Sequence, residues 1–160
     1  MLKDFFFPEL NKKFFLRVAI LIAVLVLTFS FVLQPCFING RSMQPTYGAF
    51  GFNFCNKLKY VKSPVKYGDI VILRYVGRKY FLKRVIGLAG DRIEFCYGHL
   101  FRNGKRVDED YVKLPCRWNM PPVTVKPGMI FVAGDNRSMP MLQHEFGAVR
   151  EQRIVGAPLW

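Results

Sequence analysis

The sequence is poor in acidic residues and in histidine. Asp and Glu number 11 against 24 Lys and Arg, and the two histidines are His99 and His144. Four cysteines occur, but neither a Cys-x-x-Cys spacing nor a histidine cluster offers the usual ligand set of a metal site. We therefore predict no metal and no other cofactor. The chain also lacks internal repeats and low-complexity segments, so its 160 residues suit one domain with one core plus an anchor.

The excess of basic residues gives a formal net charge of +13. Binding of nucleic acid would require Lys and Arg to be gathered on one face or in one run, whereas here they are spread along the chain. Hydrophobic residues make up 51% of the sequence and include 16 Phe, a mixture that suits a protein beside a membrane. Basic residues near anionic lipid contribute roughly 1 kcal/mol each. We expect membrane lipid as a partner, and not nucleic acid.

One long segment has no charged residue at all. The uncharged stretch runs from Val18 to Gly40, which exceeds the ~20 residues that span a bilayer. We predict a transmembrane helix over approximately Phe14 to Leu33, within an anchor at residues 14–35. The alternative is a cleavable signal peptide, but the sequence around Pro35 offers no small-x-small cleavage site.

Basic residues before this segment predict its orientation. The flank carries Lys3, Lys12, Lys13 and Arg17. The positive-inside rule counts these residues rather than net charge, so residues 1–13 should stay in the cytoplasm. Residues 36–160 are then expected to form an extracytoplasmic domain at the cell membrane.

Beyond Gly40 the pattern is typical of strands and turns, because short runs of Val, Ile, Phe and Tyr alternate with Gly, Pro, Asn and Asp. The predicted strands are Ile70–Tyr75, Tyr80–Ile86, Arg92–Cys96, His99–Arg102, Arg106–Val107 and Met129–Ala133. Asn103-Gly104 predicts a hairpin turn. Three prolines predict an irregular loop over residues 114–128. The expected fold class is an all-β domain of many short strands after one N-terminal transmembrane helix.

The four cysteines would lie in a compartment that is often oxidising. Cys96 and Cys116 flank the predicted hairpin and its return segment, so one hypothesis is a disulfide between them. The alternative is that the cysteines are thiols that pack as small hydrophobes.

Three sequence blocks follow the apolar segment in order. They are Gly40-Arg41-Ser42-Met43-Gln44-Pro45-Thr46, Lys83-Arg84-Val85-Ile86-Gly87-Leu88-Ala89-Gly90-Asp91 and Gly134-Asp135-Asn136-Arg137. Together with the anchor, they resemble the motifs of the type I signal peptidases, the bacterial leader peptidase family with a Ser/Lys dyad. The resemblance covers nearly the whole chain.

The resemblance implies a membrane-anchored serine endopeptidase that removes signal peptides from secreted preproteins. Ser42 would be the nucleophile and Lys83 the general base. The Ser42 N–H would bind the oxyanion, and Gly40 stands where some members add a hydroxyl side chain. A serine hydroxyl needs a base to become a good nucleophile, and a lysine base must be neutral.

The surroundings of Lys83 suit such a base. Phe81 and Val85 share a strand face with it, and burial beside apolar groups lowers the pKa of a lysine. The alternative is an ordinary strand lysine with its ammonium group in water.

The third block departs from the family pattern after Arg137. The family serine is replaced by Pro140, its aspartate by Leu142, and the following Ser-Arg pair by Gln143-His144. In the family that serine orients the lysine, so Ser138 is our candidate for the supporting role.

Five further residues in or beside the blocks are expected to bind the substrate, an extended preprotein with small side chains before the cut: Met43, Pro45, Phe81, Gly134 and Asp135. An alternative for Asp135 is an ion pair within the domain. The secretion machinery is a further expected partner. The aromatic residues at 50, 52 and 54 share a strand face and would contact either lipid or the core.

Two other functions remain open. The altered block would suit a catalytically impaired relative that binds preproteins or a membrane partner. A conjugative-transfer processing peptidase would also use a Ser/Lys pair, whereas an SOS-type repressor is disfavoured by the anchor and the missing DNA-binding helices.

Overall fold

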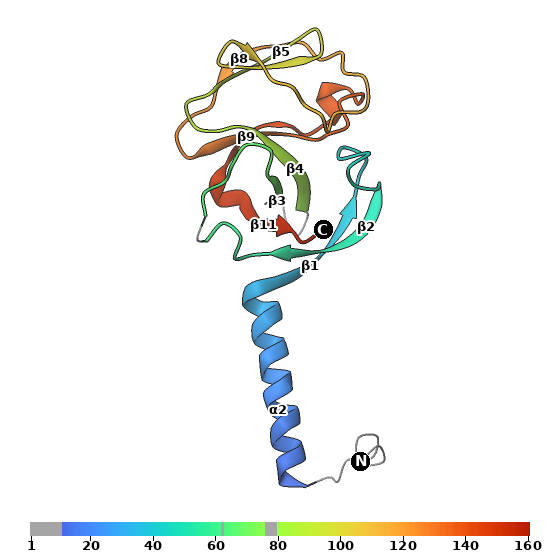
Figure 1. The fold of residues 1–160 in the computed structure, drawn as a ribbon, viewed down its shortest axis with the longest axis vertical. Coiled ribbons are helices and arrows are strands. Elements are labelled where there is room, and N and C mark those ends of the chain that lie inside the picture. Colours follow the sequence, from blue (N-terminus) through green and yellow to red (C-terminus); the bar gives the residue numbers. More distant parts are fainter. Residues whose placement is uncertain (1–10, 62, 76–79) are drawn as a thin grey trace.

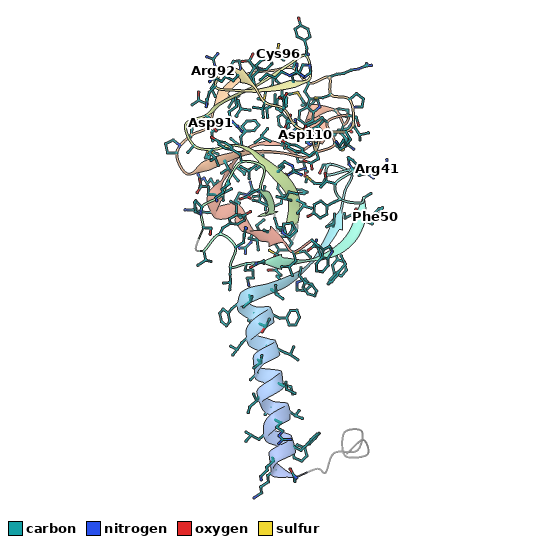
Figure 2. The ribbon with its side chains drawn as sticks, viewed as in Figure 1. Arg41, Phe50, Asp91, Arg92, Cys96 and Asp110 are labelled. Carbon is teal, nitrogen blue, oxygen red and sulfur yellow. The ribbon has the colours of Figure 1, made fainter. Side chains whose placement is uncertain are left out.

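A long helix extends from one end of a β-rich domain (Figure 1). The computed structural model describes residues 11–61, 63–75 and 80–160. Helix α2 (Lys12–Leu27) begins at Asn11, whose side chain accepts a hydrogen bond from the Phe14 N–H, and it continues into a π-helical turn, η1 (Thr28–Val32). Its side chains project outward on all sides and none is buried (Figure 2). Lys12–Val32 is long and apolar enough to cross a membrane, with a mean hydropathy of 2.6.

The boundaries of the helix correct the predicted ones. The helix begins two residues before Phe14 and ends at Val32, and residues 33–35 of the predicted anchor belong to strand β1 (Leu33–Asn39). The physical reason is that Leu33 already pairs with Asn56 of the next strand, a contact that hydropathy does not reveal. Residues 1–10, which include Lys3, lie outside the described residues.

The described strands form two antiparallel sheets. A seven-stranded sheet has the order β1-β2-β11-β3-β4-β9-β10, and a four-stranded sheet has the order β7-β6-β5-β8. The remaining bounds are β2 (Phe50–Asn56), β3 (Ile70–Arg74), β4 (Tyr80–Gly87), β5 (Arg92–Cys96), β6 (His99–Arg102), β7 (Lys105–Arg106), β8 (Met120–Thr124), β9 (Met129–Ala133), β10 (Gly147–Arg150) and β11 (Ile154–Pro158), with 3₁₀ turns η2 (Met141–Gln143) and η3 (Glu151–Arg153). The four-stranded sheet lies at the end of the domain farthest from α2 (Figure 1).

The core lies on both faces of β4 and β9 because their side chains alternate. Ile86 and Phe131 face the four-stranded sheet and pack with Phe95 and Trp118. The neighbouring valines of both strands point the other way and join a second cluster, which contains Val71, Leu73, Val85, Ile130 and Val132. Strand β4, which carries Lys83, is therefore held rigidly from two sides.

Most of the predicted strands are confirmed, and the all-β fold class with them. The bounds of β5, β6 and β9 are as predicted, β3 and β4 differ by one residue at one end, and β7 is shifted by one residue. Asn103 and Gly104 have φ values of 55° and 77°, so the predicted hairpin turn is present.

The predicted irregular loop over residues 114–128 is wrong, because it contains strand β8. This strand lies at the edge of its sheet, where proline is tolerated. Its two prolines, Pro121 and Pro122, fall where the register with β5 shifts, between the pairs Ile93–Val123 and Phe95–Met120.

All four cysteines are free thiols, so the hypothetical disulfide between Cys96 and Cys116 is not formed in this structure. Cys36 and Cys55 are buried in the core beneath β1 and β2. Cys96 and Cys116 are half-buried, and Cys96 lies at the end of the domain away from α2 (Figure 2).

Candidate active site

Ser42 and Lys83 meet although they come from different parts of the chain. Ser42 lies in the turn between β1 and β2, and Lys83 lies in the middle of β4. The Lys83 Nζ is 2.8 Å from the Ser42 Oγ and 2.8 Å from the carbonyl oxygen of His144, to which it donates a hydrogen bond. The geometry is that of a hydroxyl beside an amine that can exchange a proton with it.

Lys83 is buried, with 2% of its surface exposed, so the alternative of a solvated strand lysine is wrong. Burial lowers the pKa of Lys83 to about 8, while the charge of Glu145 acts in the opposite direction. The ring of Phe81 lies 5.8 Å from Nζ, on the strand face that the alternation predicted. At pH 7 roughly a tenth of such an amine is neutral, compared with under a thousandth for an ordinary lysine.

Hydrogen bonds to Asn136 hold the turn that carries Ser42. The Asn136 N–H donates to the Ser42 carbonyl at 2.9 Å, and its side-chain amide donates to the Arg41 carbonyl at 3.0 Å. Gly40, at φ 145°, donates to the Ala49 carbonyl and closes the turn. Within the described part of the chain the Ser42 N–H donates no hydrogen bond. It is therefore available to an oxyanion.

Asp135 fastens this turn to β4. Its carboxylate accepts from the Arg84 Nε at 2.8 Å and Nη2 at 2.6 Å, and from the Thr46 hydroxyl at 2.6 Å. Asp135 is fully buried, and Arg84 also stacks 4.0 Å from the ring of Tyr111. The structure therefore forms the internal ion pair that was the alternative to substrate binding by Asp135.

The next residues of the block also serve the scaffold. The buried Arg137 guanidinium makes two hydrogen bonds with Glu109, at 2.7 and 2.9 Å, and a third with the Gly134 carbonyl. The Ser138 hydroxyl donates to the Asn136 side chain at 2.6 Å. Among the described residues, no hydrogen bond joins Ser138 to Lys83, and the support that we expected from Ser138 comes from the His144 carbonyl.

A small, mostly apolar pocket adjoins Ser42, with a cavity volume of about 40 Å³. It is lined by residues of β1, β2, β3, β4, β11 and the turn that carries Ser42: Cys36, Phe37, Ile38, Asn39, Gly40, Ser42, Met43, Asn53, Ile72, Tyr80, Phe81, Leu82 and Pro158. Of the residues expected to bind substrate, Met43 and Phe81 line this pocket, whereas Pro45, Gly134 and Asp135 do not. Gly134 packs behind Ser42, since a Cβ there would collide with the Ser42 carbonyl and His144 Nε2.

Comparison with known proteins places this arrangement in a family. Residues 11–159 match the family described as signal peptidase, peptidase S26. The chain is 36% identical over 140 residues to a signal peptidase I of Bacillus caldolyticus, covering 79% of this chain and 77% of that protein. The chain belongs to the signal peptidase family.

Other relatives extend the match. A probable signal peptidase I of Synechocystis is 34% identical over 154 residues, which is 91% of this chain and 78% of that protein. The crystal structure of a signal peptidase I from Enterococcus faecalis aligns with a TM-score of 0.48 and 26% identity, over 59% of this chain and 97% of that chain. This signal peptidase family member is thus an enzyme, as the three sequence blocks predicted.

The role of His144 could not be predicted from the side-chain pattern. What holds the Lys83 amine is a backbone carbonyl, which every residue type carries. The signal in the sequence was negative, because Pro140 stands where the family serine orients the lysine and so left Lys83 without its expected partner.

We predict that a titration of Lys83 in the detergent-solubilised protein will give a pKa of about 8, well below that of a free lysine, because burial disfavours its ammonium form. Glu145→Gln should lower this pKa further, since the glutamate charge favours the ammonium. NMR of ¹³C-labelled lysine, with Lys83→Met to assign the signal, measures both values. An unshifted pKa, or a rise in Glu145→Gln, would contradict this electrostatic description.

Proposed function

We propose that this protein is a membrane-anchored serine endopeptidase that removes signal peptides from secreted preproteins. Ser42 is its nucleophile and Lys83 its general base. The observation that carries the proposal is the 2.8 Å hydrogen bond between the Ser42 Oγ and the Nζ of a buried lysine. Membership in the signal peptidase family supports the substrate class, and we expect the secretion machinery to deliver the preproteins.

The contacts of Lys83 suit a cycle of proton transfers. A neutral amine has two hydrogens and one lone pair, so Nζ can donate to the His144 carbonyl while its lone pair takes the proton of the Ser42 hydroxyl. The Oγ then attacks the scissile carbonyl, and the oxyanion accepts from the Ser42 N–H. The ammonium of Lys83 returns the proton to the departing amine. Water then hydrolyses the acyl-enzyme by the same route in reverse.

An extended peptide fits beside this pair. Strand β1 is an edge of the seven-stranded sheet, and β4 pairs with β9 only from Arg84 onward, so residues 80–82 of β4 keep one side open toward β1 within the described strands. Residues of β1 and β4 line the same pocket at Ser42, so a peptide between these strands would use the backbone groups of both. The small pocket at Ser42 then admits a small side chain just before the cut.

An aromatic surface supports contact with lipid at the base of the domain. We define it as Phe29, Phe37, Phe50, Phe52, Phe54 and Trp160. Phe37 and Phe50 are each 79% exposed and Trp160 is 63% exposed, while edge-to-face contacts link Phe52 to Phe37 and Phe54. Phe29 belongs to η1 and touches Phe54, so the surface is continuous with the apolar helix. Burial of Phe50 and Phe52 in the core, the alternative from the sequence, is wrong.

The same arrangement supports a fixed attachment to the membrane. The Lys57 N–H donates to the Val32 carbonyl and its ammonium to the Ser30 carbonyl, so strand β2 and the end of the helix are joined directly. With the N-terminus in the cytoplasm, as the basic flank favours, the domain lies outside the cell at the membrane surface.

The first prediction of this proposal concerns cleavage. The membrane-reconstituted protein should cut a labelled preprotein after its Ala-x-Ala sequence, and Ser42→Ala and Lys83→Ala should each lower the rate by at least about 10³-fold because nucleophile and base act as a unit. Mass spectrometry of the products gives the site and the rate. Ser63→Ala and Lys126→Ala, which alter exposed residues, are the matched controls and should cleave normally.

Leu142 is fully exposed where the family has aspartate, an observation that favours the catalytically impaired relative. That alternative predicts retained preprotein binding with no cleavage by any variant. A conjugative-transfer peptidase would instead cut at a different sequence, so the product masses separate all three functions.

A second prediction concerns the aromatic surface. Phe50→Ser should weaken cleavage of a preprotein in lipid vesicles several-fold but leave cleavage of a short soluble peptide in detergent unchanged, because the ring is solvent-exposed and does not line the pocket at Ser42. Tyr97→Ser is the matched control, since Tyr97 is 84% exposed on the hairpin at the opposite end of the domain. Equal effects of the two substitutions in vesicles would argue against lipid contact.

A further inference from the structure

Lys83 is held by a backbone atom rather than by a second side chain. Apart from the Ser42 hydroxyl, its described hydrogen-bond partner is the His144 carbonyl, at 2.8 Å. Two nearby side chains do not serve as partners for the Lys83 amine. Pro140 has no polar side-chain atom, and the Ser138 hydroxyl donates its hydrogen bond to Asn136. A backbone carbonyl can orient an amine only if the segment that carries it is fixed.

The side chain of His144 provides this fixation. Its imidazole is completely buried, and its Nε2 accepts a hydrogen bond of 2.7 Å from the Gly134 N–H. The ring also packs edge-to-face on Trp118, with centroids 4.5 Å apart. The histidine that presents its carbonyl to Lys83 is thus fastened through its own side chain to the end of β9.

Gly134 connects this contact to the nucleophile. Its Cα packs so closely against the Ser42 carbonyl that no Cβ fits there. Residues 134, 144, 83 and 42 therefore form a closed ring of contacts: Gly134 to the His144 imidazole, the His144 carbonyl to Lys83, Lys83 to Ser42, and Ser42 back to Gly134.

Contacts at both ends hold the turn before His144: Trp118 Nε1 donates to the Met139 carbonyl at 2.8 Å and Met141 packs against the core, while the His144 imidazole holds the end nearest Lys83. His144 ends the short turn η2, where its N–H reaches the Met141 carbonyl, and the following Glu145 adopts a positive φ of 46°. Neighbouring Leu142 is entirely exposed and has no packing to hold the loop. The imidazole is the buried anchor at the end of this turn nearest Lys83.

We propose that His144 is a positioning residue: its imidazole, as a hydrogen-bond acceptor for the Gly134 N–H, sets its own carbonyl at the distance that orients the Lys83 amine toward Ser42. This inference rests on the proposed function of Ser42 and Lys83. The imidazole itself exchanges no proton in the reaction. Burial, together with the charges of Lys83 and Arg137, lowers its pKa to about 3, so it remains a neutral acceptor.

Two substitutions of His144 separate its role as a hydrogen-bond acceptor for the Gly134 N–H from other roles of the imidazole. In His144→Gln the amide oxygen is as many bonds from the backbone as Nε2, so it can accept from Gly134, but it cannot act as a base. His144→Leu fills the site with an apolar side chain but removes the acceptor, which leaves the buried Gly134 N–H without this partner. His99→Leu, at an exposed position on β6, is the control.

We expect His144→Leu to lower kcat for peptide cleavage about tenfold or more, with KM within about twofold of the wild type, because the pocket is untouched while the base is misplaced. His144→Gln should retain kcat within about threefold. Thermal denaturation in detergent establishes that each variant is folded. If His144→Leu does not fold, His144→Asn replaces it, because its shorter amide cannot reach Gly134.

Three results overturn the inference: unchanged kcat in the folded Leu or Asn variant, a loss in His144→Gln as large as in His144→Leu, or a loss carried by KM alone. Ser42→Ala is run in the same assay. If that variant still cleaves, the proposed function itself fails; if it is inactive while all His144 variants cleave normally, only the positioning role fails.

Discussion

The structure depends on the burial of one amine. A lysine with 2% of its surface exposed loses the hydration of its ammonium, so its pKa falls to about 8 and its neutral form becomes accessible. That cost is tolerated because β4 is central in its sheet and packed on both faces. The adjacent Arg84 points the other way and meets Asp135 instead. Neighbouring basic residues on one strand thus have different surroundings: the Lys83 amine lies beside the Ser42 hydroxyl, and the Arg84 guanidinium forms a structural ion pair.

The segment after β9 fixes what surrounds this amine. Asp135 ties the turn that carries Ser42 to β4, Asn136 donates to the carbonyls of Arg41 and Ser42, and Arg137 forms an ion pair with Glu109. Consecutive residues in one short stretch of chain therefore hold both the turn that carries Ser42 and the strand that carries Lys83. None of the side chains of the Gly-Asp-Asn-Arg block makes a described hydrogen bond to the Ser42 Oγ. The block nevertheless marks the site in the sequence, because it holds the segments that carry Ser42 and Lys83.

Sequence predicts best what depends on local side-chain pattern. The alternation of Phe81, Lys83 and Val85 placed the lysine correctly, and turn residues marked the hairpin at Asn103. Prediction from the sequence failed where pairing between residues far apart in the chain determines the secondary structure. Strand β1 is concealed because its apolar residues continue those of the helix, and β8 because its prolines are acceptable only at an edge. The carbonyl of His144 could not be foreseen at all, since backbone atoms carry no sequence signature.

The covalent step of the proposed cycle offers the most direct test. Rapid acid quenching of the reconstituted protein with its preprotein, followed by digestion and peptide mass spectrometry, would capture an ester between the signal-peptide carboxyl group and the attacking hydroxyl. We expect this adduct on the peptide that contains Ser42 in the wild type, and we expect it to be absent in Lys83→Ala. An adduct on another residue, or an undiminished adduct without Lys83, would contradict the proposed cycle.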